Sequence, residues 1–274
     1  MTDTSRLDLA LVARGLARSR NAAAAAIAEG RVRVAGRLAA KPSAVVTAAD
    51  DITVTGTTPV SRAAAKLEAA LDAFGVDVRG AVALDLGAST GGFTEVLLRR
   101  GASTVVALDV GHGQLVPEVA SHPRVLSIEG ENARDLTSER LAELTGGLPA
   151  PGVVVADLSF ISLRQVLPAI AAVAAPGADV VCLIKPQFEV GRTVVAEGIV
   201  RDPAARVPAV RRVLETAHAN GLGTAGLLAS PLPGLHGNRE VLALLSATRG
   251  SDPAEWEDQL VRATGGDDGR HDDG

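Results

Sequence analysis

From about residue 80 onward, short runs of apolar residues alternate with stretches in which apolar positions recur every three or four residues. The runs predict strands, because a strand that is buried on both faces is apolar throughout, and the spaced pattern predicts helices. We expect strands over Ala81–Leu86, Thr104–Asp109, Arg124–Ile128, Gly152–Asp157, Ala178–Ile184, Leu222–Ala229 and Val241–Ser246. We expect helices over Gly92–Arg100, Gln114–Ala120, Thr137–Leu144, Leu163–Ala174 and Pro203–Asn220. This order predicts an α/β fold with a Rossmann-like, mostly parallel, seven-stranded sheet.

The N-terminal part follows another pattern and predicts a small α+β domain. One short helix is expected to stop at Gly15, and a second is capped by Ser19 and ends at Gly30. Strands are expected over 32–34, where valines alternate with arginines, and over 52–54.

These patterns divide the chain into four segments. The small domain is expected over residues 1–55, a linker over 56–61, and the large domain over 62–250. An acidic C-terminal segment is expected over 251–274, with a last helix near 253–264 and a disordered end from 265.

Charge is distributed unevenly over these segments. Residues 1–49 hold eight basic and three acidic side chains, whereas 251–274 hold two basic and eight acidic ones, and the whole chain carries −5. A basic module on an acidic chain favours a polyanion contact at one end, although a solvated charged face would give the same balance.

Composition narrows the classes of protein further. The single cysteine, Cys182, excludes a disulfide framework and a cysteine-based zinc site, so no metal is expected. The chain begins with no apolar run typical of a signal peptide, and no stretch is long enough for a membrane helix, so we expect a cytoplasmic protein. Only three of its 27 basic residues are lysines: Lys41, Lys66 and Lys185. Lysine can be tuned toward neutrality and arginine cannot, so these lysines are candidates for chemistry.

A glycine-rich turn follows the first strand of the large domain, in Leu84-Asp85-Leu86-Gly87-Ala88-Ser89-Thr90-Gly91-Gly92-Phe93. A turn between a strand and a helix presents backbone N–H groups to a ligand, and Asp109, at the end of the next strand, has the spacing of an acid that binds a ribose. The pattern predicts a cofactor that contains adenosine. Ser89 stands where a dinucleotide site needs glycine, and Asp85 is a poor neighbour for phosphate, so S-adenosylmethionine is favoured over NAD(P).

Four charged residues are expected near the same edge of the sheet. Asp157 and Lys185 end two strands, Lys66 lies on the helix before the first strand, and Glu240 comes just before the last strand. Two lysines in one cleft raise the cost of protonating each other, so one of them can act as a base. Each residue also has an ordinary explanation: Lys66 as a surface helix position, Glu240 as a partner of an arginine, and Asp157 as a helix cap.

Several short segments, taken in their order along the chain, match the motifs of a known protein family. They are Leu16-Ala17-Arg18-Ser19-Arg20, Gly30-Arg31-Val32-Arg33-Val34, Gly87–Thr94, Ala156-Asp157-Leu158-Ser159-Phe160-Ile161-Ser162, Lys185-Pro186-Gln187-Phe188-Glu189 and Ser230-Pro231-Leu232-Pro233-Gly234 with Glu240. Over residues 5–248 the chain resembles the TlyA family, ribosomal RNA 2′-O-methyltransferases that are also described as hemolysin-like. The first part is similar to an S4 RNA-binding domain and the rest to the FtsJ-type methyltransferase fold. Ala63-Ala64 depart from the glycine-containing turn common in this family.

The resemblance implies an enzyme that methylates a ribose 2′-oxygen in ribosomal RNA, a cytidine of 16S or 23S RNA or both, with S-adenosylmethionine as the methyl donor. It implies a catalytic tetrad of Lys66, Asp157, Lys185 and Glu240, with Lys185 nearest the acceptor hydroxyl as a base or as an orienting donor. The implied cofactor-binding residues are Asp85, Gly87, Ser89, Thr90, Gly91, Phe93, Asp109, Asn132 and Asp157. The implied RNA-binding residues are Arg6, Arg18, Ser19, Arg20, Arg31, Arg33, Lys41 and Arg62.

Three other hypotheses come from different classes. A pore-forming protein is suggested by the hemolysin description, and the lack of a membrane span or a basic amphipathic helix argues against it. A non-catalytic RNA-binding protein would not need the intact glycine turn and tetrad. An NAD-dependent oxidoreductase would leave the scarce lysines and the basic domain unexplained.

Overall fold

The computed structural model describes residues 4–17, 19–28, 30–55, 60–190, 198–234 and 237–265. The chain forms two compact units, residues 1–59 and 60–274, and each is described by itself. Most of the expected linker, at 56–59, and the expected disordered end, at 266–274, lie outside the described residues.

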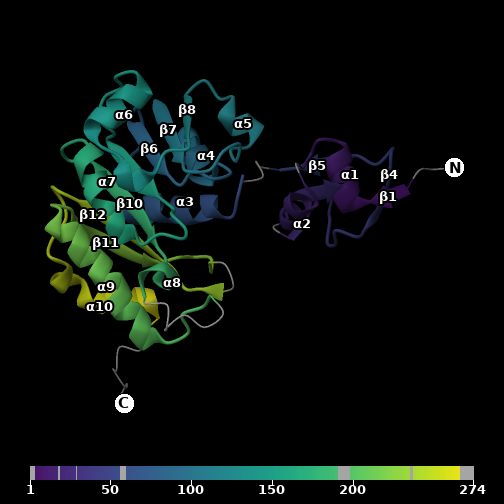
Figure 1. Ribbon diagram of the computed structural model, residues 1–274. Helices are drawn as coiled ribbons and strands as arrows, with labels where there is room; N and C mark the ends of the chain where they lie inside the picture. Colours follow the sequence, from purple (N-terminus) through teal and green to yellow (C-terminus); the bar gives the residue numbers. More distant parts are fainter. Residues whose placement is uncertain are drawn as a thin grey trace, which may run out of the picture. The chain divides into compact units, whose positions relative to one another are not determined.

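The first unit packs two helices, α1 (Leu7–Ala13) and α2 (Arg20–Ala28), on short strands (Figure 1). β2 (Val32–Val34) pairs with β3 (Arg37–Leu38) and β5 (Ile52–Val54), and β1 (Thr4–Arg6) pairs with β4 (Val45–Thr47). The sequence pattern did not predict β1, β3 and β4, because strands of two or three mostly exposed residues carry no alternation to detect.

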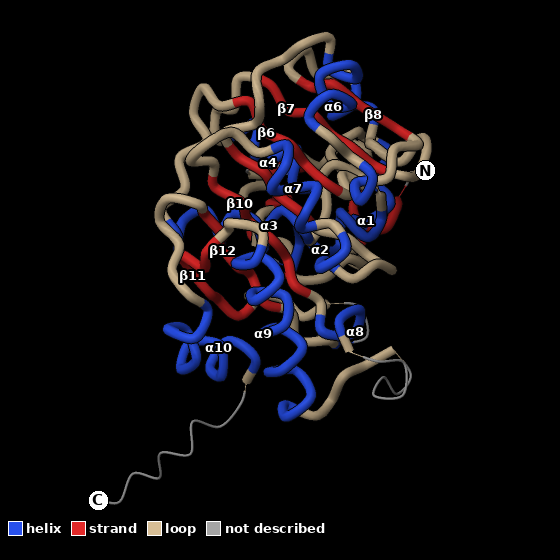
Figure 2. Tube along the Cα trace, turned by 60° about the vertical axis from the view of Figure 1, so that its left-hand side comes forward, coloured by secondary structure: helices blue, strands red, loops and turns tan. Residues whose placement is uncertain are grey.

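The second unit contains the expected sheet, drawn as red strands side by side in Figure 2. Its seven strands are β6 (Val82–Leu86), β7 (Thr104–Asp109), β8 (Val125–Glu129), β9 (Val153–Ala156), β10 (Asp179–Ile184), β11 (Gly223–Ala229) and β12 (Val241–Ser246). The spatial order is β11-β12-β10-β9-β6-β7-β8, and β12 is antiparallel to both of its neighbours. The prediction of a mostly parallel seven-stranded sheet is confirmed.

Helices cover both faces of this sheet. The face that carries Leu84 and Leu86 packs against α6 (Ser138–Thr145), α7 (Leu167–Val173), α9 (Pro203–Ala219) and α10 (Glu257–Thr264). The face that carries Ala83 packs against α3 (Ala63–Phe74) and α4 (Gly92–Arg99). The strands alternate between two apolar cores, which is why each is apolar along its whole length. Among the described helices, none is long and apolar enough to cross a membrane.

Three predicted helices begin or divide differently. α5 (Pro117–Ala120) begins at its proline, and the helix expected over 163–174 is a 3₁₀ turn (Leu163–Gln165) followed by α7. The helix expected over 253–264 likewise begins with a 3₁₀ turn, Pro253–Trp256. α5, α7 and the 3₁₀ turn at 253–256 each have a proline in their first turn, where a missing N–H costs nothing. A short helix that was not predicted, α8 (Pro186–Glu189), follows β10.

The strand order reverses between the parallel neighbours β6 and β9, because the chain continues from β6 to β7 on one side of the sheet and from β9 to β10 on the other. A ligand binds at such a switch point, outside the carboxyl ends of the strands. The strand order also differs from that of the parallel sheet in dinucleotide-binding domains, because here the antiparallel strand β12 lies between β10 and β11.

Candidate active site

A cavity of about 520 Å³ opens at this switch point. Five of its lining residues were expected to bind the cofactor: Gly87, Ser89, Asp109, Asn132 and Asp157. They come from the ends of β6, β7 and β9 and from the segment after β8, so the parallel sheet brings together residues 70 positions apart.

Gly87 allows the turn after β6 to pass close to the turn after β9. Its φ is +81°, and a Cβ atom at this position would lie 2.8 Å from the carbonyl oxygen of Asp157. Ser89 also has a positive φ, +47°, and its N–H donates to Oδ2 of Asp109 at 2.8 Å. The turn therefore has a fixed shape and leaves open space beside it.

We expect Gly87→Ala to lower cofactor affinity at least tenfold, because the methyl group would push Asp157 away from the turn and strain the backbone. Isothermal calorimetry with S-adenosylmethionine measures this. Gly80→Ala is the matched control, because Gly80 has a similar φ of +71° and its Cβ would meet nothing within 4 Å. Equal losses of affinity in both variants would contradict the prediction.

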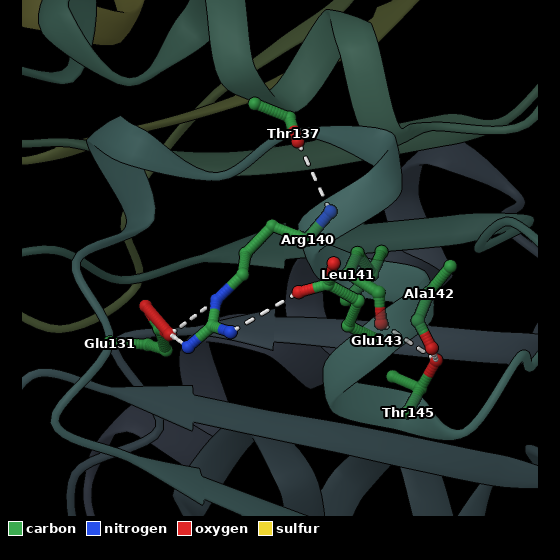
Figure 3. Close-up of polar contacts among 7 residues, drawn as sticks. All are labelled: Glu131, Thr137, Arg140, Leu141, Ala142, Glu143 and Thr145. Carbon is green, nitrogen blue, oxygen red and sulfur yellow. Dashed lines mark hydrogen bonds and ion pairs between the residues drawn. The ribbon is translucent and has the colours of Figure 1, made fainter.

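The acids that line the cavity are held by other groups. Asp109 accepts the N–H of Ser89 through Oδ2 and that of Gly111 through Oδ1, both at 2.8 Å. Asn132 caps the turn that follows it by accepting the N–H of Arg134 at 3.1 Å. Glu131, a lining residue that the sequence did not single out, is paired with Arg140 of α6, which also reaches Glu143 (Figure 3). These contacts fix the side chains before a ligand arrives.

Asp85 differs from the expectation, because it lies beneath the turn and does not line the cavity. It is fully buried and accepts the Thr94 hydroxyl at 2.6 Å through Oδ2, while Oδ1 has no hydrogen bond within the described part of the chain. Burial raises the pKa of the Asp85 carboxyl to about 7, the Thr94 hydrogen bond opposes the shift, and the charges of Asp157 and Asp109 add to it. Asp85 thus ties the turn to α4.

This shift predicts a pH dependence of stability. An aspartate in the unfolded chain ionises near pH 4, whereas Asp85 in the folded protein keeps its proton to about pH 7. The folded state therefore binds more protons between these values, and Asp85 lowers stability as the pH rises from about 4 to about 7. Asp85→Asn cannot ionise and keeps an acceptor for Thr94, so its stability should fall less over this range. Urea unfolding at pH 5, 6, 7 and 8 tests this, and parallel profiles for the two proteins would contradict it.

The other predicted turn residues divide between two places. Thr90 and Phe93 line a second cavity, of about 330 Å³, and not the first. Gly91 lines neither, and a Cβ there would meet Leu115 and Val119 at 3.0 Å.

The second cavity adjoins the first, since Gly87, Ser89, Asp157 and Ser159 line both. Lys185 reaches this cavity from the end of β10. Its Nζ lies 2.7 Å from Oδ1 of Asp157 and donates to Oγ of Ser159 at 2.8 Å. An ammonium group has three N–H donors, and within the described residues these two contacts leave at least one for a ligand.

Lys66 and Glu240 form a separate, buried pair. Nζ of Lys66 donates to Oε2 of Glu240 at 2.5 Å, with side chains only 10% and 2% exposed. Lys66 is therefore not a surface position, and Glu240 pairs with a lysine and not with an arginine. In the described residues this pair lines neither of the two cavities, so the four residues form two ion pairs at one edge of the sheet.

Three neighbours of the site were quoted in the motifs without a role. Ser159 holds Lys185, and Phe160, which is 91% exposed with a φ of +66°, has its ring 5.5 Å from that of Phe188. Buried Glu189 accepts the Leu163 N–H at 2.7 Å and the Ser162 hydroxyl at 2.5 Å. It therefore fixes the loop that carries Phe160. The signal in the sequence was the scarcity of aromatics, since Phe160 is one of four phenylalanines and lies in a motif segment.

Two basic residues of the first unit, Arg6 and Arg20, share one acid. Buried Asp8 accepts Nε of Arg6 at 2.9 Å and Nη2 of Arg20 at 3.1 Å, and the Arg6 hydrogen bond, aided by Arg20, lowers the pKa of Asp8 to about 2. Arg33 is exposed and donates to the Gly36 carbonyl, and Lys41 is exposed.

The remaining RNA-binding candidates lie in different parts of the chain. Ser19 accepts the Ala22 N–H at 3.2 Å, and Arg31 is half-buried. Arg62 belongs to the second unit, where it lines the 330 Å³ cavity. Arg18 lies outside the described residues.

The sheet order and the cavity at its switch point define the class of Rossmann-like methyltransferases. A solved protein from Listeria monocytogenes, described as an S-adenosylmethionine-dependent methyltransferase, shares this fold with a TM-score of 0.50 at 16% identity, over 68% of this chain and 97% of that one. The model of the FtsJ-like methyltransferase family matches residues 59–246, and that of the S4 domain matches residues 5–52.

The chain belongs to the FtsJ-like methyltransferase family and, within it, to the TlyA family that its motifs predicted. It is 50% identical to the 16S/23S rRNA (cytidine-2′-O)-methyltransferase TlyA of Mycobacterium tuberculosis, over 88% of this chain and 89% of the relative. A solved structure from Streptococcus thermophilus, described as a hemolysin, is 34% identical with a TM-score of 0.69 and covers 96% of both chains. The predictions of family and of enzyme class are confirmed.

Proposed function

We propose that this enzyme transfers a methyl group from S-adenosylmethionine to the 2′-oxygen of a ribose in ribosomal RNA. The observation that carries the proposal is the Asp157–Lys185 ion pair at the boundary of two adjoining cavities. One cavity has the features of a cofactor site, and the other brings Lys185 beside it. The name of the M. tuberculosis relative supports cytidine in 16S or 23S RNA as the acceptor.

The residues of the larger cavity fit S-adenosylmethionine. Gly87 keeps the space beside the turn free of a Cβ atom. In this proposal Asp109 binds the ribose hydroxyls and Asn132 contacts the adenine, since both line the cavity. Asp157 lines both cavities, and in this proposal it binds the methionine end. When bound, the cofactor supplies a methyl group on a positively charged sulfur, and these residues would hold it beside the smaller cavity.

Lys185 is the residue nearest the acceptor hydroxyl in this proposal. Asp157 and Ser159 fix its Nζ, so the remaining position on Nζ either orients the 2′-oxygen or takes its proton. Lys66 and Glu240 support the site from beneath as a buried pair whose charges cancel. Phe160 offers an exposed aromatic face at the mouth of the larger cavity, which suits stacking with an unpaired base.

The first unit supplies a grip on the RNA in the same proposal. Asp8 orients Arg6 and Arg20, and their exposed guanidinium groups, with Arg33 and Lys41, suit contacts with phosphate. Such contacts position an RNA without reading its sequence.

Incubation of the full chain with methyl-labelled S-adenosylmethionine and ribosomal subunits tests the proposal. The label should enter the RNA, and alkali should fail to cleave the RNA backbone at the labelled nucleotide. Resistance to alkali at that nucleotide identifies a 2′-O-methyl group. Absence of label from both subunits and from naked ribosomal RNA would overturn the proposal, and leakage of liposomes by the same preparation would favour the pore-forming hypothesis.

A further inference from the structure

A third cavity, of about 240 Å³, lies on the other side of Glu240. The turn over residues 230–233 forms one wall, and the end of α10 forms another. Arg239 and Arg262 line it, and both side chains are exposed. Neither residue was among the RNA-binding candidates from the sequence.

Among the described residues, no acid neutralises the charge of these two arginines. In the described part of the chain neither has an ion-pair partner, and the one acid that lines the cavity, Glu240, is already paired with Lys66. Burial lowers the pKa of the nearby Arg206, and the charge of Arg239 lowers it further. The guanidinium of Arg206 donates hydrogen bonds to the backbone carbonyl oxygens of Val200, Arg201 and Thr264.

Arg239 lies against the C-terminal end of α10. Its Nη1 lies so close to Gly265, the C-cap of α10, that a Cβ there would be 2.0 Å away. The negative end of a helix attracts a cation but carries only about half a unit charge, so this contact orients Arg239 without cancelling its charge. Two guanidinium groups, each with five N–H donors, then face one small cavity.

This cavity adjoins the one that contains Lys185. Nη2 of Arg62, which lines the Lys185 cavity, donates to the carbonyl oxygen of Pro233 at 3.1 Å, and Pro233 lines the arginine cavity. A strand whose ribose enters the Lys185 cavity thus has its continuing backbone beside Arg239 and Arg262.

We propose that Arg239 and Arg262 bind one backbone phosphate of the acceptor RNA strand. Guanidinium groups suit phosphate because their planar donors match its oxygens in pairs. This site deepens the proposed function, on which it rests, by adding an RNA contact on the catalytic unit to the contacts of the first unit.

The test compares Arg239→Gln/Arg262→Gln with the unchanged chain in binding to ribosomal RNA without cofactor, over a series of salt concentrations. Each phosphate contact contributes about 0.7 to 1 to the slope of log affinity against log salt, so the variant should lose about that much slope and bind about tenfold more weakly. Its kcat and its affinity for S-adenosylmethionine should stay within about twofold. Arg79→Gln is the matched control, because Arg79 is an exposed arginine that precedes β6, at the opposite edge of the sheet.

A second variant, Arg239→Lys/Arg262→Lys, keeps both charges and should keep the slope, which separates a phosphate contact from a loss of folding. An unchanged slope in the Gln variant, or an equal loss in Arg79→Gln, would overturn the phosphate site. Failure of the unchanged chain to methylate RNA would overturn the proposed function instead, and the binding slopes would still decide the phosphate site.

Discussion

Lys185→Ala is expected to lower the rate of methyl transfer about 10³-fold, because it removes the only lysine that lines the acceptor cavity among the described residues. Loss of a positioned acid, base or charged donor typically costs 10² to 10⁴ in rate. The measurement is a single-turnover rate with saturating RNA and cofactor. Affinity for S-adenosylmethionine should change little, because Lys185 does not line the larger cavity.

Lys41→Ala provides the matched control for this variant. Lys41 is exposed on the first unit, so its loss should weaken RNA binding and leave the rate at saturating RNA unchanged. A Lys185→Ala enzyme that keeps more than a tenth of the rate would exclude a catalytic role for Lys185.

Lys185→Arg then separates the two roles that the geometry allows. Arginine donates hydrogen bonds but does not give up its proton near neutral pH. Substantial activity in this variant would identify Lys185 as an orienting donor, whereas loss equal to that of Lys185→Ala would favour a base.

The sequence predicted the parts of the fold that depend on local patterns. All seven strands of the large sheet were found within about two residues of their bounds, because strands buried on both faces are apolar throughout. β1 and β4 could not be found in this way, since their pairing joins residues 40 positions apart and buries little. Pairings of that kind are set by tertiary contacts.

The sequence predicted which residues belong to the candidate site better than it predicted which of them contact one another. Scarcity of lysine pointed to Lys66 and Lys185, and the ends of the strands pointed to Asp109 and Asp157. No pattern along the chain could tell that Lys66 pairs with Glu240, 174 residues away, or that Asp85 faces Thr94 and not the cavity. Such facts depend on which face of an element is covered, and that follows only from packing.

The Lys66–Glu240 pair gives the second large expected effect. Glu240→Leu leaves the charge of Lys66 buried without its partner, and Lys66→Met leaves the charge of Glu240 buried without its partner. Breaking a buried ion pair from one side typically costs about 3–5 kcal/mol of folding stability, because the remaining charge has no compensation. Each single variant should show this loss in urea unfolding.

The double variant, Lys66→Met/Glu240→Leu, decides what the pair is for. Replacing both partners with apolar side chains of similar size removes both buried charges, so most of the lost stability should return. Methyl transfer should stay at least about 10²-fold low if the pair supports Lys185 and Asp157 in catalysis, since the field of its charges is gone. Recovery of activity together with stability would show that the pair only holds α3 against the start of β12.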